Sequence, residues 1–242
     1  MAIVAADLVK YGAANFPEAD AGTVGGAIST VTRAISFVQA SSTAPKAASS
    51  NAGDTMTLTI FGRLTTGAAD SEAIALTGTS QITFTKTFAY ITKATLGSAA
   101  AGTVTIYMNN GSTVIVAIPA GITKNIRFFN NSESEASQAI RYESEWWKNN
   151  HGSLTLLAAK IRLTADPAAK IRIGLANGAD QTSTNRKTAP SSVAFVDDSV
   201  DIDVTSVAAG GSKQIWVEQT LSANDSPYNQ TYTTELRGTT AA

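Results

Sequence analysis

Short apolar runs with a two-residue rhythm, separated by turn residues, limit the fold of this chain more than any other feature. The clearest case is GTVTIYMNNGSTVIVAI at residues 102–118. Apolar side chains alternate with small or polar ones on both arms, as they do in a half-buried strand. Asn110–Gly111 separates the arms and favours a type I′ turn, because both residues tolerate positive φ. The stretch therefore predicts a β-hairpin. Its inward positions would be Val104, Ile106, Met108, Val114, Val116 and Ile118.

The same rhythm recurs along most of the chain. In TMTLTIFGRL at 55–64, threonine alternates with Met56, Leu58 and Ile60, which predicts a strand with one apolar face and one hydroxyl-bearing face. From residue 121 onward, further short extended runs follow, mostly separated by Gly, Asn, Asp, Ser or Pro. No stretch has the 3.6-residue apolar stripe of a substantial helix. We therefore expect an all-β protein built from β-sandwich domains.

Turn residues and composition shifts suggest the domain boundaries. Residues 1–35 contain breakers at Pro17 and Gly25–Gly26, and their helical spacing is enough for only two turns. We expect this stretch to be an extended N-terminal arm that orders against something else. A first β-sandwich-like domain is predicted at 36–120, and an Ig-like β-sandwich at 121–242.

Composition narrows the possible partners. Charged residues make up 15% of the chain, below the roughly 25% usual in soluble domains. The net charge of −1 provides no basic field that would gather nucleic acid. The absence of cysteine excludes disulfides and thiolate metal sites. The first twenty residues lack a basic leader region, and Asp7 and Lys10 interrupt their apolar run, so we expect neither a signal peptide nor a membrane span.

The segment ESEWWKNNHG at 143–152 concentrates the residues most often used in chemistry. It holds two of the three tryptophans and the only histidine. In a strand, alternate residues share a face. One face would carry Ile140, Tyr142, Ser144 and Trp146, and the other Arg141, Glu143, Glu145 and Trp147. The first face is predicted to pack in a core and the second to meet solvent, with Trp147 at the strand end and a turn at NNHG.

The same segment is where an active site would have to lie. His151 would be in the solvated turn, and it has neither a second histidine nor a cysteine with which to bind a metal. Glu143 and Glu145 would stand about 6–7 Å apart, a spacing that some inverting glycosidases use. On a solvent-facing strand beside Arg141, however, both would stay ionised and neither would donate a proton. We therefore predict no catalytic residue and no enzyme.

Four aspartates at 197–203 raise the possibility of a calcium site: Asp197, Asp198, Asp201 and Asp203. Their spacing is not that of the twelve-residue calcium loop. Strand alternation accounts for the last two, which would point outward while Val200, Ile202 and Val204 point inward. GTVGGAIST at 22–30 lacks the strand–helix frame of a phosphate loop. We expect no metal and no cofactor.

Residues 55–107 also carry an ordered set of motifs. A strand ending in Gly-Arg is followed by Ser-Glu, Leu and Gly, then by Phe and Ile, and finally by Gly-Thr-Val. The matching residues are Gly62–Arg63, Ser71–Glu72, Leu76, Gly78, Phe88, Ile91 and Gly102–Val104. This order resembles virion proteins of tailed bacteriophages. Residues 1–29, 146–156 and 215–238 resemble such proteins as well.

The resemblance implies a structural virion protein with immunoglobulin-like β domains that acts by contact with other virion proteins. It leaves the position open among neck or collar, tail or baseplate accessory, and capsid decoration. It also implies a homo-oligomer made in the bacterial host cytoplasm and released at lysis. The alternative is an adhesin or carbohydrate-binding module that stacks aromatic side chains on sugars. The candidates for that stacking are Trp147, Trp216, Tyr228 and Tyr232.

Overall fold

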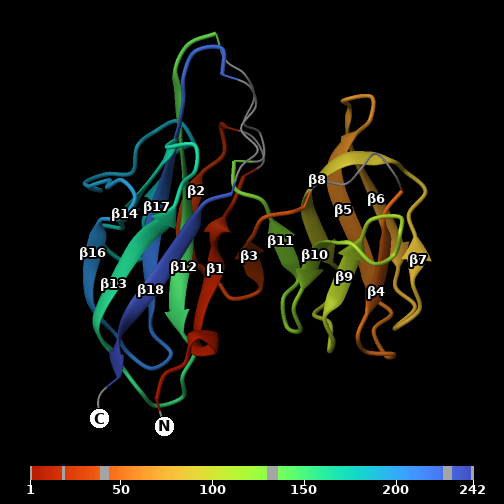
Figure 1. Ribbon diagram of the computed structural model, residues 1–242, viewed down its shortest axis with the longest axis horizontal. Helices are drawn as coiled ribbons and strands as arrows, with labels where there is room; N and C mark the ends of the chain where they lie inside the picture. The colour runs from red at the N-terminus through yellow and green to blue at the C-terminus, as the bar shows by residue number, and fades with distance from the viewer. Residues whose placement is uncertain (1, 18–19, 39–43, 130–135, 226–230, 241–242) are drawn as a thin grey trace. The chain divides into compact units, whose positions relative to one another are not determined.

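The computed structural model describes residues 2–17, 20–38, 44–129, 136–225 and 231–240. Within those ranges the chain forms eighteen strands, and its one helical element is the short 3₁₀ turn η1, Ala5–Asp7 (Figure 1). The prediction of an all-β fold with several sheets is confirmed. No helix in the described ranges is long and apolar enough to cross a membrane.

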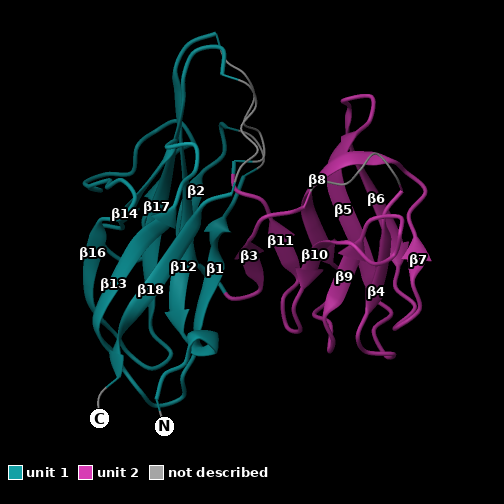
Figure 2. Cartoon of the chain, viewed as in Figure 1, with its two compact units in different colours: residues 1–29, 129–242 teal, residues 30–128 magenta. Residues whose placement is uncertain are grey.

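The chain divides into two compact units, and one is inserted into the sequence of the other (Figure 2). Unit 1 consists of residues 1–29 and 129–242, and unit 2 of residues 30–128. This division differs from the predicted arm at 1–35 and domains at 36–120 and 121–242. The first residues of the chain are part of the same unit as the last ones.

Unit 1 is built on a six-stranded sheet with the order β14-β17-β12-β1-β2-β15. The strands are β1 (Leu8–Asn15), β2 (Val24–Ser29), β12 (Ala139–Asn149), β14 (Ile171–Leu175), β15 (Thr182–Ser183) and β17 (Ser212–Leu221). The longest of them, β12, lies between β17 and β1 and pairs antiparallel with both. This central position determines the surroundings of every side chain that β12 carries.

A second sheet of three strands covers one face of the first. In it β13 (Leu156–Ala165) pairs with β16 (Asp201–Val207) and with β18 (Thr233–Thr240). The Thr234 hydroxyl of β18 donates to the Glu145 carboxylate of β12 at 3.0 Å. The odd-numbered side chains of β12 therefore face the second sheet. Apolar residues of both sheets close this interior, and several are fully buried: Ile161, Leu163, Ile173, Ile215 and Val217.

The N-terminal residues are strands of unit 1 and not the predicted arm. β1 pairs with β12 in a register that sets Lys10 opposite Trp147 and Gly12 opposite Glu145, and β2 then pairs with β1. The expected helical turns are reduced to η1, where the Asp7 carboxylate accepts a hydrogen bond from the Val4 amide at 2.9 Å. Strand formation prevails because a long partner strand is supplied from more than a hundred residues away, which local spacing does not reveal.

Unit 2 contains a five-stranded and a four-stranded sheet, with the orders β3-β11-β8-β5-β6 and β10-β9-β4-β7. The strands are β3 (Thr32–Ala34), β4 (Lys46–Ser49), β5 (Thr57–Leu64), β6 (Ala69–Ala75), β7 (Ile82–Thr83), β8 (Phe88–Leu96), β9 (Val104–Tyr107), β10 (Val114–Ile118) and β11 (Lys124–Ile126). The predicted alternation in β5 is confirmed, because Leu58 and Ile60 are fully buried while Thr57 is exposed.

The predicted hairpin is present as β9 and β10, but its turn is different. A loop of residues 108–113 joins the strands, and only Gly111 of the Asn110–Gly111 pair has positive φ. The Asn110 side-chain oxygen instead accepts hydrogen bonds from the amides of Ser112 and Thr113. A bulge follows, so that Val114 is 43% exposed and does not point inward.

The position of β1 leads to a prediction about truncation. Deletion of residues 1–29 removes two strands from the middle of the large sheet and exposes the unpaired edge of β12. We expect unit 1 to unfold, as measured by loss of its cooperative thermal transition, and deletion of residues 1–2 to leave that transition unchanged. A shortened protein with an intact unit 1 would contradict the placement of these strands.

Candidate functional site

The faces of β12 differ in part from the sequence-based expectation. Tyr142, Ser144 and Trp146 are buried, as predicted, but Ile140 of the same predicted face is 36% exposed. Glu143 and Glu145 were expected to face solvent, but both have no exposed surface. The expectation fails because β12 is central in a sheet that is covered on both faces. The second sheet covers the odd-numbered residues, and the even-numbered side belongs to a cluster of Val24, Tyr142 and Trp216 packed against Ala176, Val193 and Phe195.

Glu143 lies at the centre of a buried ion pair. One of its carboxylate oxygens accepts a hydrogen bond from the Phe129 amide at 2.9 Å, and the other contacts the Arg186 guanidinium. Arg186 has no exposed surface, and burial lowers its pKa to about 10, so it stays charged at neutral pH. A buried carboxylate held by a cation and an amide is an ionised structural group.

Arg141 and Asp20 extend this pair into a small network. The Arg141 Nε atom lies 3.2 Å from the Asp20 carboxylate, and the Arg186 guanidinium and the Lys187 ammonium lie 3.9 Å and 3.5 Å from it. Burial raises the pKa of Asp20, but the Arg141 hydrogen bond and the three positive charges outweigh it, and the pKa lies below its usual value. The network joins four separate stretches of chain, at residues 20, 129, 141–143 and 186.

Glu145 occupies a second, distinct environment on the same face. One oxygen accepts the Thr234 hydroxyl, and the other lies 3.5 Å from the Lys10 ammonium. That ammonium is placed 5.7 Å from the centroid of the Trp147 ring and 5.9 Å from that of Tyr232, which are cation–π distances. Glu143 and Glu145 thus use their oxygens on different partners.

The tryptophans are internal anchors. Trp147, which was expected at an exposed strand end, is only 8% exposed, and Trp216 is fully buried. The Trp146 indole donates to the Gly26 carbonyl at 3.1 Å, and the Trp216 indole donates to the Gln181 side chain at 2.9 Å. Gly25 must be glycine here, because it has φ of +87° and a Cβ atom would lie 2.9 Å from the Trp216 ring. These contacts hold β2 against β12 and the loop after β14 against β17.

His151 lies in the connection between β12 and β13, where a turn was predicted. Its ring is half-buried, and Nδ1 accepts hydrogen bonds from the amides of Ser153 and Leu154. The structure does not bring it to Glu143 or Glu145 as a catalytic partner. The imidazole shapes the loop.

The aspartate segment is divided between two environments. Asp201 of β16 accepts from Arg162 at 2.8 Å and from Arg237 at 2.7 Å, and Lys160 is 3.4 Å away. These cations lower the pKa of Asp201 to about 2, with the Arg237 hydrogen bond as the largest cause. Asp203 is exposed as predicted and Val204 is buried, but Val200 is 45% exposed because it precedes the strand.

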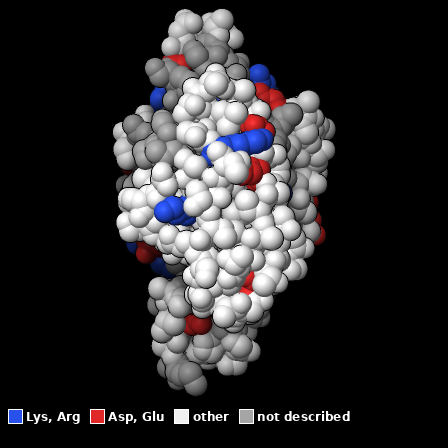
Figure 3. Space-filling model, turned by 90° about the vertical axis from the view of Figure 1, so that its right-hand side faces the viewer, with Lys and Arg blue, Asp and Glu red and all other residues white. Residues whose placement is uncertain are grey.

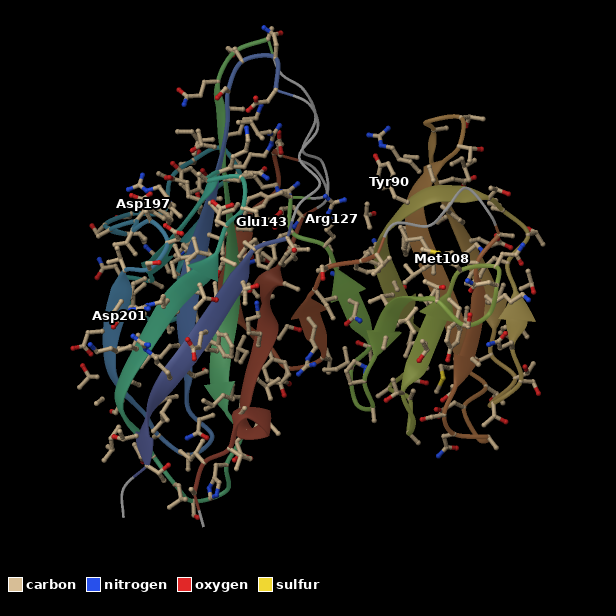
Figure 4. All side chains as sticks on the ribbon, viewed as in Figure 1. Tyr90, Met108, Arg127, Glu143, Asp197 and Asp201 are labelled. Carbon is tan, nitrogen blue, oxygen red and sulfur yellow. The ribbon has the colours of Figure 1, made fainter. Side chains whose placement is uncertain are left out.

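The described residues contain no group of three or more His, Cys, Asp or Glu placed to hold a metal ion. Asp197 and Asp201 are separated in Figure 4, and Asp197 projects toward Arg172, with 3.5 Å between carboxylate and guanidinium. The calcium hypothesis therefore has no set of converging oxygens in this part of the chain. Tyr228, one of the stacking candidates, lies outside the described residues.

In comparisons with known proteins, no protein-family model, no curated protein and no solved structure matches this chain.

The buried ion pair predicts a large effect from a small substitution. Glu143→Gln removes the buried anion that contacts Arg186 and leaves this charged, fully buried guanidinium with the Asp20 carboxylate 3.9 Å away, so we expect unit 1 to lose about 3–5 kcal/mol of unfolding free energy. Urea denaturation measures this loss, and Glu235→Gln on the exposed side of β18 is the matched control. Equal stability of the two variants would show that Glu143 is not bound as described.

Asp201 predicts a pH dependence with a definite sign. The pKa of Asp201 is lower in the folded state than in the unfolded state, so its ionisation stabilises the folded protein. This contribution to the unfolding free energy is fully present above the unfolded pKa of about 4 and is lost as the pH falls through the folded value of about 2. Asp201→Asn should lower the melting temperature at pH 7, and the difference from wild type should shrink between about pH 4 and pH 2. A difference that stays constant over this range would contradict the contacts with Arg162 and Arg237.

Proposed function

We propose that this chain is a structural component of a tailed-bacteriophage virion and acts through protein–protein assembly contacts. The first candidate position is the neck, collar or tail accessory region, and the second is capsid decoration. Its partners are other virion proteins and further copies of itself, and it works without catalysis. It is made in the host cytoplasm and becomes part of the particle.

The observation that carries this proposal is the structural role of the residues that match the virion-protein motifs. Phe88, Ile91 and Val104 are fully buried in unit 2. Gly62 lies in β5 where a Cβ atom would meet the Tyr90 carbonyl at 2.1 Å, and Glu72 accepts the amides of Thr85 and Lys86. Each of these matched positions thus serves the packing or closure of a β unit, as expected of a pattern inherited for architecture.

The site geometry supports the same proposal. The carboxylates and tryptophans that could have served chemistry or sugar stacking form the internal supports of unit 1, as described above. Of the stacking candidates, Trp147 and Trp216 are buried, and Tyr232 is half-buried beside Lys10. A protein that assembles with other proteins needs an accessible surface on a rigid fold. The buried ion pairs and tryptophan side chains of unit 1 make its fold rigid.

Part of the surface is also suited to contact with other protein. Figure 3 shows one face of the molecule, and wide areas of this face carry neither Lys, Arg, Asp nor Glu. A surface without charged side chains costs little free energy to desolvate, because charged groups are the most costly ones to remove from water. The cores of stable protein interfaces are depleted of charge in the same way.

The proposal is tested by asking whether the protein is found in phage particles. Particles from a lysate of the bacterium that carries the gene are banded in a density gradient, and the protein is assayed in the band with an antibody. We expect it to co-sediment with particles and to be labelled by immunogold at one position on them. Protein found entirely in the soluble fraction would refute the proposal, and binding to a glycan array by that soluble protein would favour the adhesin alternative.

A further inference from the structure

The dipeptide Asn-Gly occurs twice in the chain, at residues 110–111 and 177–178. Such a pair can react with itself, because glycine has no side chain that would shield its backbone nitrogen from the asparagine side chain. In this reaction the glycine nitrogen attacks the side-chain carbonyl carbon, Cγ, of the asparagine. The rate depends on how easily the two atoms reach a near-attack arrangement, so the local structure of each pair decides its reactivity.

Both reacting groups of the first pair are engaged in hydrogen bonds. The Asn110 side-chain oxygen accepts from the amides of Ser112 and Thr113 at 3.0 and 2.9 Å, and its side-chain nitrogen donates to the Thr113 hydroxyl at 2.7 Å. The Gly111 nitrogen, which would be the nucleophile, donates to the Met108 carbonyl at 2.9 Å. These bonds close the loop between β9 and β10, and they must break before the pair can react.

The second pair lies in the loop after β14, and its reacting groups are not bound in this way. The backbone amide of Asn177 donates to the Gln181 side chain at 3.1 Å. Among the residues that the structure describes, however, none forms a hydrogen bond with the Asn177 side chain or with the Gly178 nitrogen. Asn110 and Asn177 are both exposed, so hydrogen bonding and not access to water distinguishes the two pairs.

The backbone around the second pair has room to change conformation. Residues 177–180 are all exposed, and a Cβ atom on Gly178 would find no other atom within 4 Å. The segment is anchored at its two ends. The Ala176 amide donates to the Gln214 carbonyl at 3.1 Å, and the Gln181 amide donates to the Gln214 side chain at 2.8 Å. An exposed segment with few bonds of its own opens at a low free energy, while its anchors stay in place.

We propose that Asn177 is a site of self-modification by deamidation, and that Asn110 is protected from the same reaction in the folded protein. The Gly178 nitrogen bonds to Cγ of Asn177, and the side-chain nitrogen leaves with the Gly178 proton as ammonia. Water then hydrolyses the cyclic imide at either carbonyl, which leaves an aspartyl or an isoaspartyl residue at position 177. The loop that already carries Asp180 thereby gains one negative charge. This inference is independent of the proposed assembly function.

Peptide mapping by mass spectrometry tests the proposal. The purified full chain is incubated at mildly alkaline pH, and the peptides that contain Asn110 and Asn177 are quantified over time. We expect the Asn177 peptide to convert at least about tenfold faster than the Asn110 peptide, because Asn110 and Gly111 must first break their hydrogen bonds. The isoaspartyl product is identified by its methylation with a protein-isoaspartate methyltransferase.

Unfolding the protein provides the matched control. In guanidinium chloride both Asn-Gly pairs lose their surroundings, so the two peptides should convert at similar rates. Asn177→Gln should stop the conversion in the loop after β14, because the longer side chain has to close a larger ring. The same variant should leave the rate at Asn110 unchanged.

Three results would overturn the inference. An Asn177 peptide that stays unmodified in the folded protein, while it converts in the unfolded chain, would refute the site. Equal rates at Asn110 and Asn177 in the folded protein would refute the protection of Asn110. A rate difference that persists after unfolding would assign it to the neighbouring sequence and not to the hydrogen bonds of the folded loops. None of these results depends on whether the protein is found in phage particles.

Discussion

The structure of unit 1 depends on the burial of a charged strand face. β12 carries Arg141, Glu143 and Glu145 into the space between two sheets, where an unpaired charge would cost several kcal/mol. Each charge therefore needs a partner from elsewhere in the chain. Asp20, Arg186 and Lys10 supply them, and they come from the segment after β1, the loop after β15 and β1 itself. Ion pairing thus specifies which distant stretches surround β12.

The same pairing explains how an inserted unit is accommodated. The chain leaves unit 1 after β2 and returns at Phe129, whose amide donates to Glu143. The residue at the point of return is thereby bonded to a fully buried charge of the sheet. Unit 2 has its own core and its own capped edge strand, where Lys86 donates to the Ser71 carbonyl of β6. Each unit thus has its own set of buried residues and internal contacts.

Local pattern predicted the strands well and their partners poorly. The alternation in 55–64, the hairpin at 102–118 and the buried Trp146 follow from side-chain periodicity, which a sequence displays directly. The solvent-facing assignment of Glu143 and Glu145 failed because polar residues normally mark an exposed strand face, and this rule does not hold where Arg186 and Lys10 supply buried partners. The N-terminal arm was expected for a related reason, since a strand whose partner lies more than a hundred residues away has no local signature.

Amide hydrogen exchange tests the central claim most directly, because it reports which segments open together. If both ends of the chain form one unit around β12, the amides of β1 and the Phe129 amide should exchange as slowly as those of β12 and β17, at a common opening free energy. Unit 2 should show its own value. Rapid exchange at Phe129 and throughout β1, with β12 still protected, would contradict the account.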